Sequence, residues 1–249
     1  MTTRNFFTFL LVLLFAATLF GQNQSKPNDG TVGARLFPPN AVSDWSIGFY
    51  AGTTENHLEI DVSYATDMKY SDADGVLYGL FGEYHLTGWF SFRGEMDFVQ
   101  KNYRMDRSHK YLYFVYTEAT NNYLSVPVMA VLSLGRSFRV SGFVGAYAGY
   151  WLSGHREGQS LSVSYLISGN MDDTYFSDGY SFNKQRDNRF DAGLVYGFGI
   201  RYAIARKLDL TAEMRYLYGL TDMQKAYMTD LNPRYNTTKT LQIGVGYWF

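Results

Sequence analysis

The chain has 249 residues, and its 22 basic and 23 acidic side chains leave a formal net charge of −1. This balance lacks the basic face that nucleic-acid binding requires, so we expect no nucleic-acid partner. The absence of cysteine excludes disulfides, thiolate metal sites, thiol catalysis and anchoring through a lipidated cysteine. Aromatic residues make up 18% of the chain. They favour strands and membrane interfaces, and a bilayer accommodates aromatic surface that would cause aggregation in water.

The first residues have the pattern of a secretory signal peptide. Arg4 supplies a positive charge, residues 6–20 form an uninterrupted apolar run, and a polar stretch begins after Gly21. A transmembrane anchor is the alternative, but a spanning helix needs about 20 apolar residues. We therefore predict a signal peptide over residues 1–21. Residues 22–44 are polar and rich in proline, which predicts a flexible periplasmic leader.

From Trp45 onward, apolar and polar residues alternate with a period of two, as in strands with two different faces. The last segment is the clearest, because Leu241 and Ile243 fall on one face and Gln242 falls on the other. The first segment is the shortest. Eight segments are predicted as strands, over residues 46–53, 76–86, 90–98, 124–132, 138–150, 190–202, 208–218 and 240–249.

The connections between these segments alternate in length. Three are tight, at residues 86–89, 134–137 and 204–207, and four are long and polar, at residues 54–75, 105–122, 152–189 and 219–239. Short periplasmic turns and long external loops in strict alternation are typical of transmembrane barrels. The sequence therefore predicts an all-β, eight-stranded antiparallel transmembrane β-barrel over residues 45–249. We expect it in the cell outer membrane, in contact with outer-membrane lipid.

The positions of the charges indicate which face points inward. One face carries the charged residues and most of the glycines, whereas the other carries large aromatics such as Tyr196 and Tyr202. Eight strands leave an interior that side chains just fill, so we expect the charged face inside and the aromatic face toward lipid. A soluble lipocalin-like barrel would need the reverse arrangement. The predicted inward-facing cluster consists of Arg93, Glu95, Asp97, Arg139, Asp191, Arg201, Asp209, Glu213 and Arg215.

Two uses of this cluster are open at the level of sequence. Paired carboxylates can perform acid–base chemistry, and mixed acids and arginines can form a salt-bridged plug. We favour the plug, because buried charges must be paired and hydrogen-bonded. A plugged lumen also argues against an open pore. Gly193 and Gly197 lie in a strand rather than before a helix, so they indicate room for facing side chains and not a phosphate site.

Two short motifs stand in the second half of the chain, Leu-Ser-Val-Pro at residues 124–127 and Arg-Tyr-Leu-Tyr-Gly-Leu at residues 215–220. Together with the stretches NNYLSVPVMAVLSLG, FRVSGFVGAYAGYWLSG and KTLQIGVGYWF, they resemble the PorT-like family of outer-membrane β-barrels. The resemblance is good over about half of the chain and looser over residues 45–105. It implies a link to protein secretion, with secretion-system proteins as partners.

The chain ends on an aromatic residue, Phe249, two positions after Tyr247. This ending resembles the C-terminal signal that the outer-membrane assembly machinery reads. An ordinary strand ending is the alternative, because aromatic residues are common throughout this chain. We interpret Phe249 as the assembly signal, since it is the last residue and has the lipid-facing parity.

Nucleophilic catalysis needs a serine with its base in reach, and the nominal pairs are Ser108 with His109 and Ser153 with His155. Adjacent residues of a strand point to opposite faces, which makes the first pair a poor arrangement. His85 is expected to face inward near a periplasmic turn. We therefore predict no enzymatic activity and no catalytic or cofactor-binding residue.

The longest loop contains Asp172, Asp173 and Asp178, which we interpret as a solvated acidic segment rather than a weak cation site. Neither a metal nor any other cofactor is predicted. The long connections are rich in tyrosine, which suits either a recognition surface or hairpins that extend past the bilayer. Both readings stay open for Tyr111, Tyr113, Tyr116, Tyr165, Tyr175, Tyr180 and Tyr227.

These patterns together predict a non-enzymatic outer-membrane barrel whose task is anchoring or interaction. Assistance to protein secretion or surface assembly follows from the PorT-like resemblance. A lipid-modifying outer-membrane enzyme and a small-solute pore are the alternatives.

Overall fold

The computed structural model describes residues 45–60, 68–107, 115–161, 163–170, 174–225 and 233–249. The predicted signal peptide and leader, residues 1–44, lie outside this part of the chain. Strands dominate the described residues, and one short helix, α3 (Val163–Ser168), accompanies them. The strands are β1 (Trp45–Ile60), β2 (Met68–His85), β3 (Phe90–Gln100), β4 (Tyr103–Arg107), β5 (Tyr116–Gly135), β6 (Phe138–Gln159), β7 (Tyr175–Gly179), β8 (Phe190–Ala205), β9 (Leu208–Gly219) and β10 (Arg234–Trp248).

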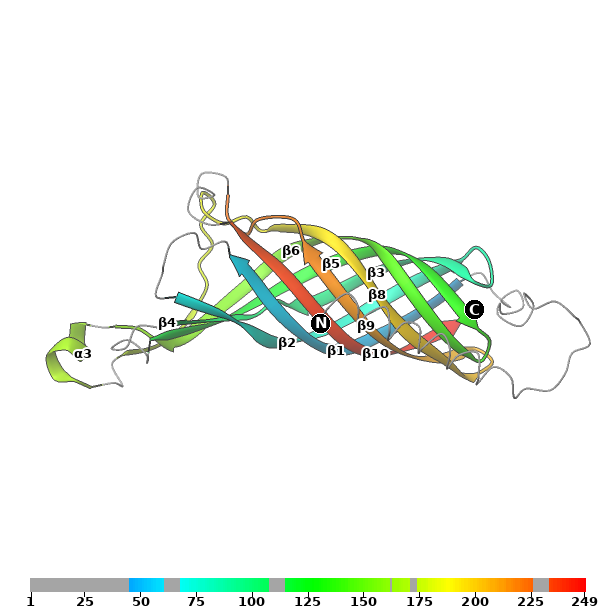
Figure 1. Ribbon diagram of the computed structural model, residues 1–249, viewed down its shortest axis with the longest axis horizontal. Helices are drawn as coiled ribbons and strands as arrows, with labels where there is room; N and C mark the ends of the chain where they lie inside the picture. Colours follow the sequence, from blue (N-terminus) through cyan, green and yellow to red (C-terminus); the bar gives the residue numbers. More distant parts are fainter. Residues whose placement is uncertain (1–44, 61–67, 108–114, 162, 171–173, 226–232) are drawn as a thin grey trace, which may run out of the picture.

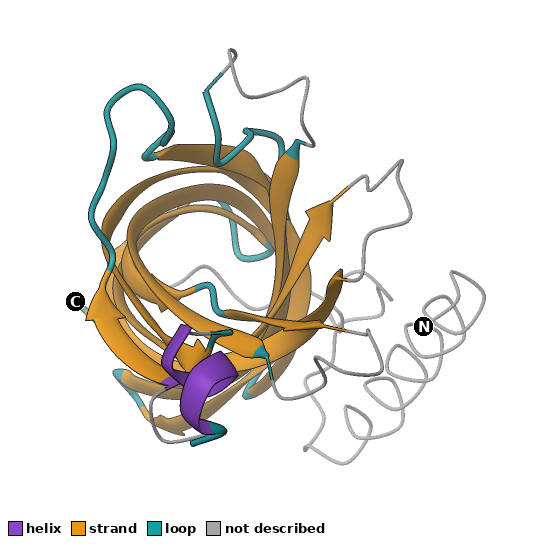
Figure 2. Ribbon diagram, turned by 90° about the vertical axis from the view of Figure 1, so that its left-hand side faces the viewer, coloured by secondary structure: helices purple, strands orange, loops and turns teal. Residues whose placement is uncertain are grey.

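The sheet closes into a ring, as Figure 2 shows along the barrel axis. Every neighbouring pair is antiparallel, and the last strand returns to the first, with Ser46 opposite Trp248 and Ile60 opposite Arg234. The strands β3 and β4 occupy one position in the ring, one after the other, since both pair with β2 and β5. The strand β7 adds only to the outer part of β6. The barrel is therefore closed by eight strands, with β3 and β4 together counted as one. The predicted fold class is confirmed.

The three tight connections lie at one end of the barrel, on the right in Figure 1, and we call this the short-turn end. They join β2 to β3, β5 to β6 and β8 to β9, as the sequence predicts. The β5–β6 turn begins at Gly135, whose φ of 117° lies in a region that side chains rarely adopt. Both β1 and β10 also meet at this end, where the Phe249 N–H donates to the Trp45 carbonyl at 3.4 Å.

At the opposite end, which we call the long-loop end, the predicted loops are wrong over much of their length. Much of residues 54–75 and 105–122 is strand, and β6 runs for 22 residues, as far as Gln159. The first strand, predicted as the shortest, has 16 residues. At about 3.3 Å per residue, β6 is about 70 Å long, more than twice the bilayer core. The hydrophobic alternation stops where the apolar surroundings stop, but the backbone pairing continues beyond it.

The outer face of the barrel is apolar over a band that begins at the short-turn end. Large side chains there are exposed by about half, including Phe49 at 59%, Leu80 at 64% and Ile243 at 62%. Farther along the same strands the outward residues become polar, as at Glu55 and Lys239. The aromatics Tyr196 and Tyr202 face outward, so the predicted inside and outside are correct. Among the described residues, no helix is long and apolar enough to cross a membrane.

Candidate functional site

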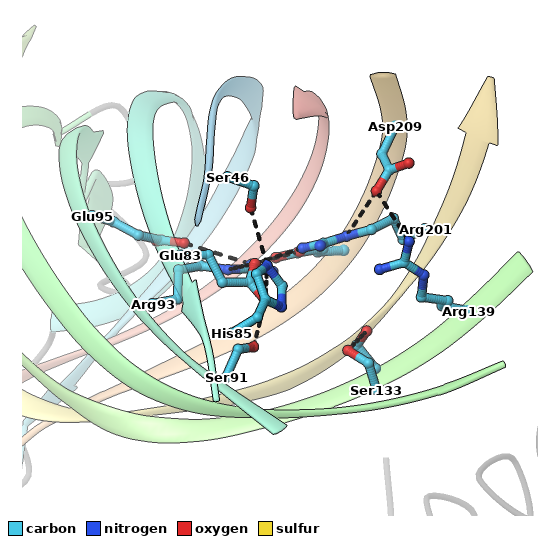
Figure 3. Close-up of polar contacts among 12 residues, drawn as sticks. Ser46, Glu83, His85, Ser91, Arg93, Glu95, Ser133, Arg139, Arg201 and Asp209 are labelled. Carbon is cyan, nitrogen blue, oxygen red and sulfur yellow. Dashed lines mark hydrogen bonds and ion pairs between the residues drawn. The ribbon is translucent and has the colours of Figure 1, made fainter. Parts of the chain in front are cut away.

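The part of the lumen nearest the short-turn end contains charged side chains from several strands (Figure 3). Glu83 of β2 lies at the centre of one half and has no solvent exposure. Its carboxylate accepts hydrogen bonds from Ser91 at 2.5 Å, from Arg93 Nε at 3.0 Å and from Arg201 Nη2 at 2.6 Å. One carboxylate of β2 therefore holds guanidinium groups from the neighbouring strand β3 and from β8, which lies across the barrel from β2.

The second half of this network is built around Arg215 of β9. Its guanidinium donates to Glu95 of β3 at 2.8 Å and to Glu213 at 2.6 Å. Glu213 also accepts from Arg93 at 2.7 Å, which links the two halves. The Tyr50 hydroxyl lies 2.7 Å from Glu95 and also contacts Asp97. The charges thus form one continuous chain of ion pairs across the lumen.

A third group of contacts closes the interior at the short turns. Trp248 Nε1 donates to Asp209 at 2.6 Å, and the Arg139 guanidinium lies 4.9 Å from the Trp248 ring centroid. Asp209 is also 3.7 Å from Arg139 and 4.0 Å from Arg201. The His85 ring stacks on Trp248 at 4.3 Å. This layer separates the charge network from the short-turn end of the barrel.

The structure places the nine sequence-predicted residues on the interior side of the wall, but not in one cluster. Eight of them are buried, and the Arg139 side chain is 16% exposed. Asp191 is separate from the rest, because it lies ten residues before Arg201 on β8, about 33 Å along the strand. The alternation of odd and even positions along a strand identifies the inward face. It does not give the position of a residue along the barrel axis.

Asp191 belongs instead to a second buried pair that sequence reasoning missed. Lys101 is fully buried, and its Nζ donates to Asp191 at 2.5 Å and to Tyr147 at 3.3 Å. Thr221 Oγ1 donates to the other carboxylate oxygen at 3.1 Å. The signal was present in the sequence, since Lys101 has the same parity as Asp97. The predicted strand ended at residue 98 and so left Lys101 out.

Between this pair and the long-loop end, four asparagines form a polar layer. Asn56 Nδ2 donates to Asn236 at 3.2 Å and to the Asn102 carbonyl at 3.1 Å, and Asn121 Nδ2 donates to the Lys101 carbonyl at 3.1 Å. All four are buried, at 8% exposure or less. This layer, the charge network and buried apolar side chains such as Val195 and Leu217 together fill the lumen.

The glycines of β8 make room for aromatic rings of the neighbouring strand β6. A Cβ at Gly197 would lie 2.8 Å from Phe143 Cε2, and one at Gly193 would lie 2.9 Å from Tyr147 Cε1. Both distances are shorter than real Cβ contacts. Phe143 in turn lies 5.9 Å from the Arg93 guanidinium and 5.2 Å from that of Arg215. The small residues therefore admit the rings that pack against the buried arginines.

Neither serine–histidine contact has the arrangement of a catalytic relay. His85 Nε2 is 3.2 Å from Ser46, and the same nitrogen is the one nearest Glu83, at 3.8 Å. His155 Nε2 is 3.1 Å from Ser177, not Ser153, and again the same nitrogen is nearest to a carboxylate. A relay needs the serine and the carboxylate on different nitrogens. The pair Ser108 and His109 lies outside the described residues.

Within the described ranges, no group of three or more histidine, aspartate and glutamate side chains is placed to hold a metal ion. Asp172 and Asp173 lie outside those ranges. Asp178 is an exposed residue of β7, opposite Arg156. The acidic segment predicted at residues 172–178 is thus described only in part.

At the long-loop end, the segment between β7 and β8 is fixed by Asp187. Its carboxylate accepts from Arg186 Nε at 2.7 Å, from Tyr180 at 2.8 Å and from the Asn183 N–H at 2.7 Å. Burial by itself would raise the pKa of Asp187, but these hydrogen bonds outweigh burial and lower the pKa from its ordinary value. The ring of Tyr180 also stacks on Trp151 at 5.0 Å.

Of the tyrosines predicted in the long connections, Tyr116 lies in β5, Tyr175 lies in β7, and Tyr180 packs inside the barrel mouth. Tyr111, Tyr113 and Tyr227 fall outside the described residues. Of the two readings of these tyrosines, their positions in strands favour hairpins that extend past the apolar band over a separate recognition surface.

Comparison with known proteins assigns the chain to a protein family. A family model described as "Outer membrane protein beta-barrel domain" matches residues 20–225. A search of curated proteins finds no match.

Among solved structures, the chain is similar to three small outer-membrane proteins. OprG from Pseudomonas aeruginosa has 11% identity over 84% of this chain and 98% of its own, with a TM-score of 0.48. The attachment invasion locus protein Ail of Yersinia pestis has 15% identity over 83% and 99%, with a TM-score of 0.40. Neisserial surface protein A has 13% identity over 83% and 98%, with a TM-score of 0.43. These identities and scores are too low to transfer a function.

Proposed function

Because this chain belongs to the outer membrane protein β-barrel domain family, we propose that it is a non-enzymatic outer-membrane protein that acts by anchoring and interaction. The barrel lies in the outer membrane, with its short turns toward the periplasm and its long-loop end outside the cell. In this proposal residues 1–21 are the export signal, residues 22–44 are a periplasmic leader, and Phe249 is read by the assembly machinery.

One observation carries the proposal: the lumen is filled where the wall is apolar, but the wall continues outward as polar strands. Glu83, Arg93 and Lys101 are each 1% exposed or less, so the membrane part offers no passage and no open site. Outside the apolar band, β5 and β6 remain paired as far as Tyr116 and Gln159. The paired outer parts of β5 and β6, which stand above the membrane on a plugged barrel, suit contact with partners.

The PorT-like resemblance directs the search for those partners toward protein secretion. The test is affinity purification of the tagged protein from its own outer membrane in mild detergent, followed by mass spectrometry. We expect secretion-system proteins in near-stoichiometric amounts, bound through the periplasmic turns or the leader. Recovery of the barrel alone would contradict the secretion role and would leave the outer hairpins as the interacting part.

The two alternative functions make different predictions. A small-solute pore predicts stable single-channel conductance in planar bilayers, whereas the filled lumen predicts none. A lipid-modifying enzyme predicts that joint replacement of His85, His109 and His155 abolishes a lipid modification without loss of folding. The proposed interaction function predicts no such loss.

A further inference from the structure

The extracellular mouth contains two adjoining cavities, which we call the mouth cavities. Each has a volume of about 240 Å³, and Tyr103, Arg156 and Arg234 line both of them. A water molecule occupies about 30 Å³ in the liquid, so each cavity has room for a compact organic molecule. The lining side chains include buried residues such as Leu58, at 3% exposure, on the interior side of β1. The cavities are therefore reached from the barrel mouth and not from the lipid face.

One wall of the first cavity contains a stack of aromatic rings. The rings of Trp151 and Tyr180 stack at 5.0 Å with an interplanar angle of 15°. The Arg156 guanidinium lies over the Tyr180 ring, 4.1 Å from its centroid, and the Tyr123 ring stacks on Trp151 at 5.9 Å. The faces of the Trp151 and Tyr180 rings are therefore occupied, and the stack holds Arg156 in place. Leu58 and Met223 add apolar side chains to the same cavity, and these are suited to contact with the ring of a ligand.

The charge of the cavity lining is unbalanced. It contains three arginines, Arg156, Arg186 and Arg234, and one carboxylate, Asp187, which Arg186 already contacts at 2.7 Å. Among the described residues, neither Arg156 nor Arg234 has a carboxylate within ion-pair distance. The Nε of Arg234 is buried and has no hydrogen-bond partner among them. Arginine presents a fork of donors that matches phosphate and carboxylate oxygens, so these two side chains are suited to an anion.

We propose that the mouth cavities bind a small soluble anion, a phosphate or carboxylate attached to a ring. Arg156 and Arg234 hold the anionic group, and the ring packs against the apolar part of the lining, which includes Leu58 and Met223. The inference deepens the proposed function, since it names a ligand class for the outward-facing end. The interior position of the cavities favours a soluble anion over a lipid headgroup as the ligand.

The test uses the full chain in phosphatidylcholine nanodiscs and phenyl phosphate as the probe. Binding is followed by the indole N–H signal of Trp151, one of four tryptophans, assigned with Trp151→Phe. We expect a saturable shift, weaker binding of inorganic phosphate, which lacks the ring, and no shift with neutral benzyl alcohol. Arg156→Gln and Arg234→Gln are each expected to raise Kd about tenfold or more, the loss that follows from removing a charge-assisted hydrogen bond.

Arg104→Gln is the matched control, because Arg104 is an arginine of the same outer region that already pairs with Glu118 at 2.6 Å. Its Kd is expected to equal that of the parent, and heat-dependent gel mobility verifies that every variant is folded. Equal binding of benzyl alcohol, or an unchanged Kd in both cavity variants, would overturn the proposal. Loss of binding on addition of phosphatidylglycerol would assign the site to a lipid instead. A purification that yields no protein partner leaves this result unaffected.

Discussion

Replacement of the central buried carboxylate is the sharpest perturbation of the charge network. Glu83→Gln keeps the shape of the side chain and removes the negative charge that lies 3.0 Å from Arg93 and 2.6 Å from Arg201. Arg93 keeps Glu213 at 2.7 Å, but Arg201 keeps only Asp209 at 4.0 Å. Arg201 is thus left almost unpaired in a buried position. Loss of one partner of a buried ion pair costs about 3–5 kcal/mol, and we expect this loss in the free energy of unfolding.

The measurement is equilibrium urea unfolding in phospholipid vesicles, followed by tryptophan fluorescence and extrapolated to zero denaturant. Glu55→Gln is the matched control, since Glu55 pairs with Lys239 at 3.3 Å and both are about half exposed. Exposed pairs contribute at most about 1 kcal/mol. The double variant Glu83→Gln with Arg201→Met removes the unpaired charge as well, and we expect it to recover about 0.5–3 kcal/mol. If Glu83→Gln costs no more than Glu55→Gln, the network does not stabilise the barrel as described.

Three further predictions concern packing, pH and assembly. Gly197→Ala is expected to destabilise the barrel by about 1–3 kcal/mol in the same unfolding assay, because its Cβ would lie 2.2 Å from the Met214 carbonyl oxygen and 2.8 Å from the Phe143 ring. Gly142→Ala, with nothing within 4 Å of its Cβ, should have little effect. The lowered pKa of Asp187 means that its stabilisation is complete above the ordinary value of 3.8 and is lost as pH falls through the lower folded value. The protection factors of the amides at residues 180–187, which are corrected for the intrinsic pH dependence of exchange, are therefore expected to fall only below about pH 4. A fall already at pH 6 would refute the assignment. Removal of Phe249 is expected to reduce the amount of barrel in the outer membrane while export is unchanged, as measured by fractionation; equal amounts would identify Phe249 as an ordinary strand end.

The sequence by itself determines the barrel and its inside and outside. Each strand within the apolar band faces two different environments, so Leu241 and Ile243 alternate with Gln242 and the fold class follows from the period. The same alternation identifies Arg93, Glu95 and Arg215 as inward-facing, because charge on the lipid side is unfavourable. The positions of the three short turns are also local, since a turn such as that at Gly135 depends on a few neighbouring residues.

Only the tertiary structure decides how far the strands run and which inward residues meet. Beyond the lipid both faces are polar, so nothing in the alternation reports that β6 continues to Gln159. The partners Arg93 and Glu213 are 120 positions apart in the chain, and their contact depends on the stagger of strands around the ring. The same stagger separates Asp191 from the other charges and pairs it with Lys101. Whether a residue faces inward depends only on its odd or even position in its own strand. Its position along the barrel axis depends on the stagger of all eight strands together.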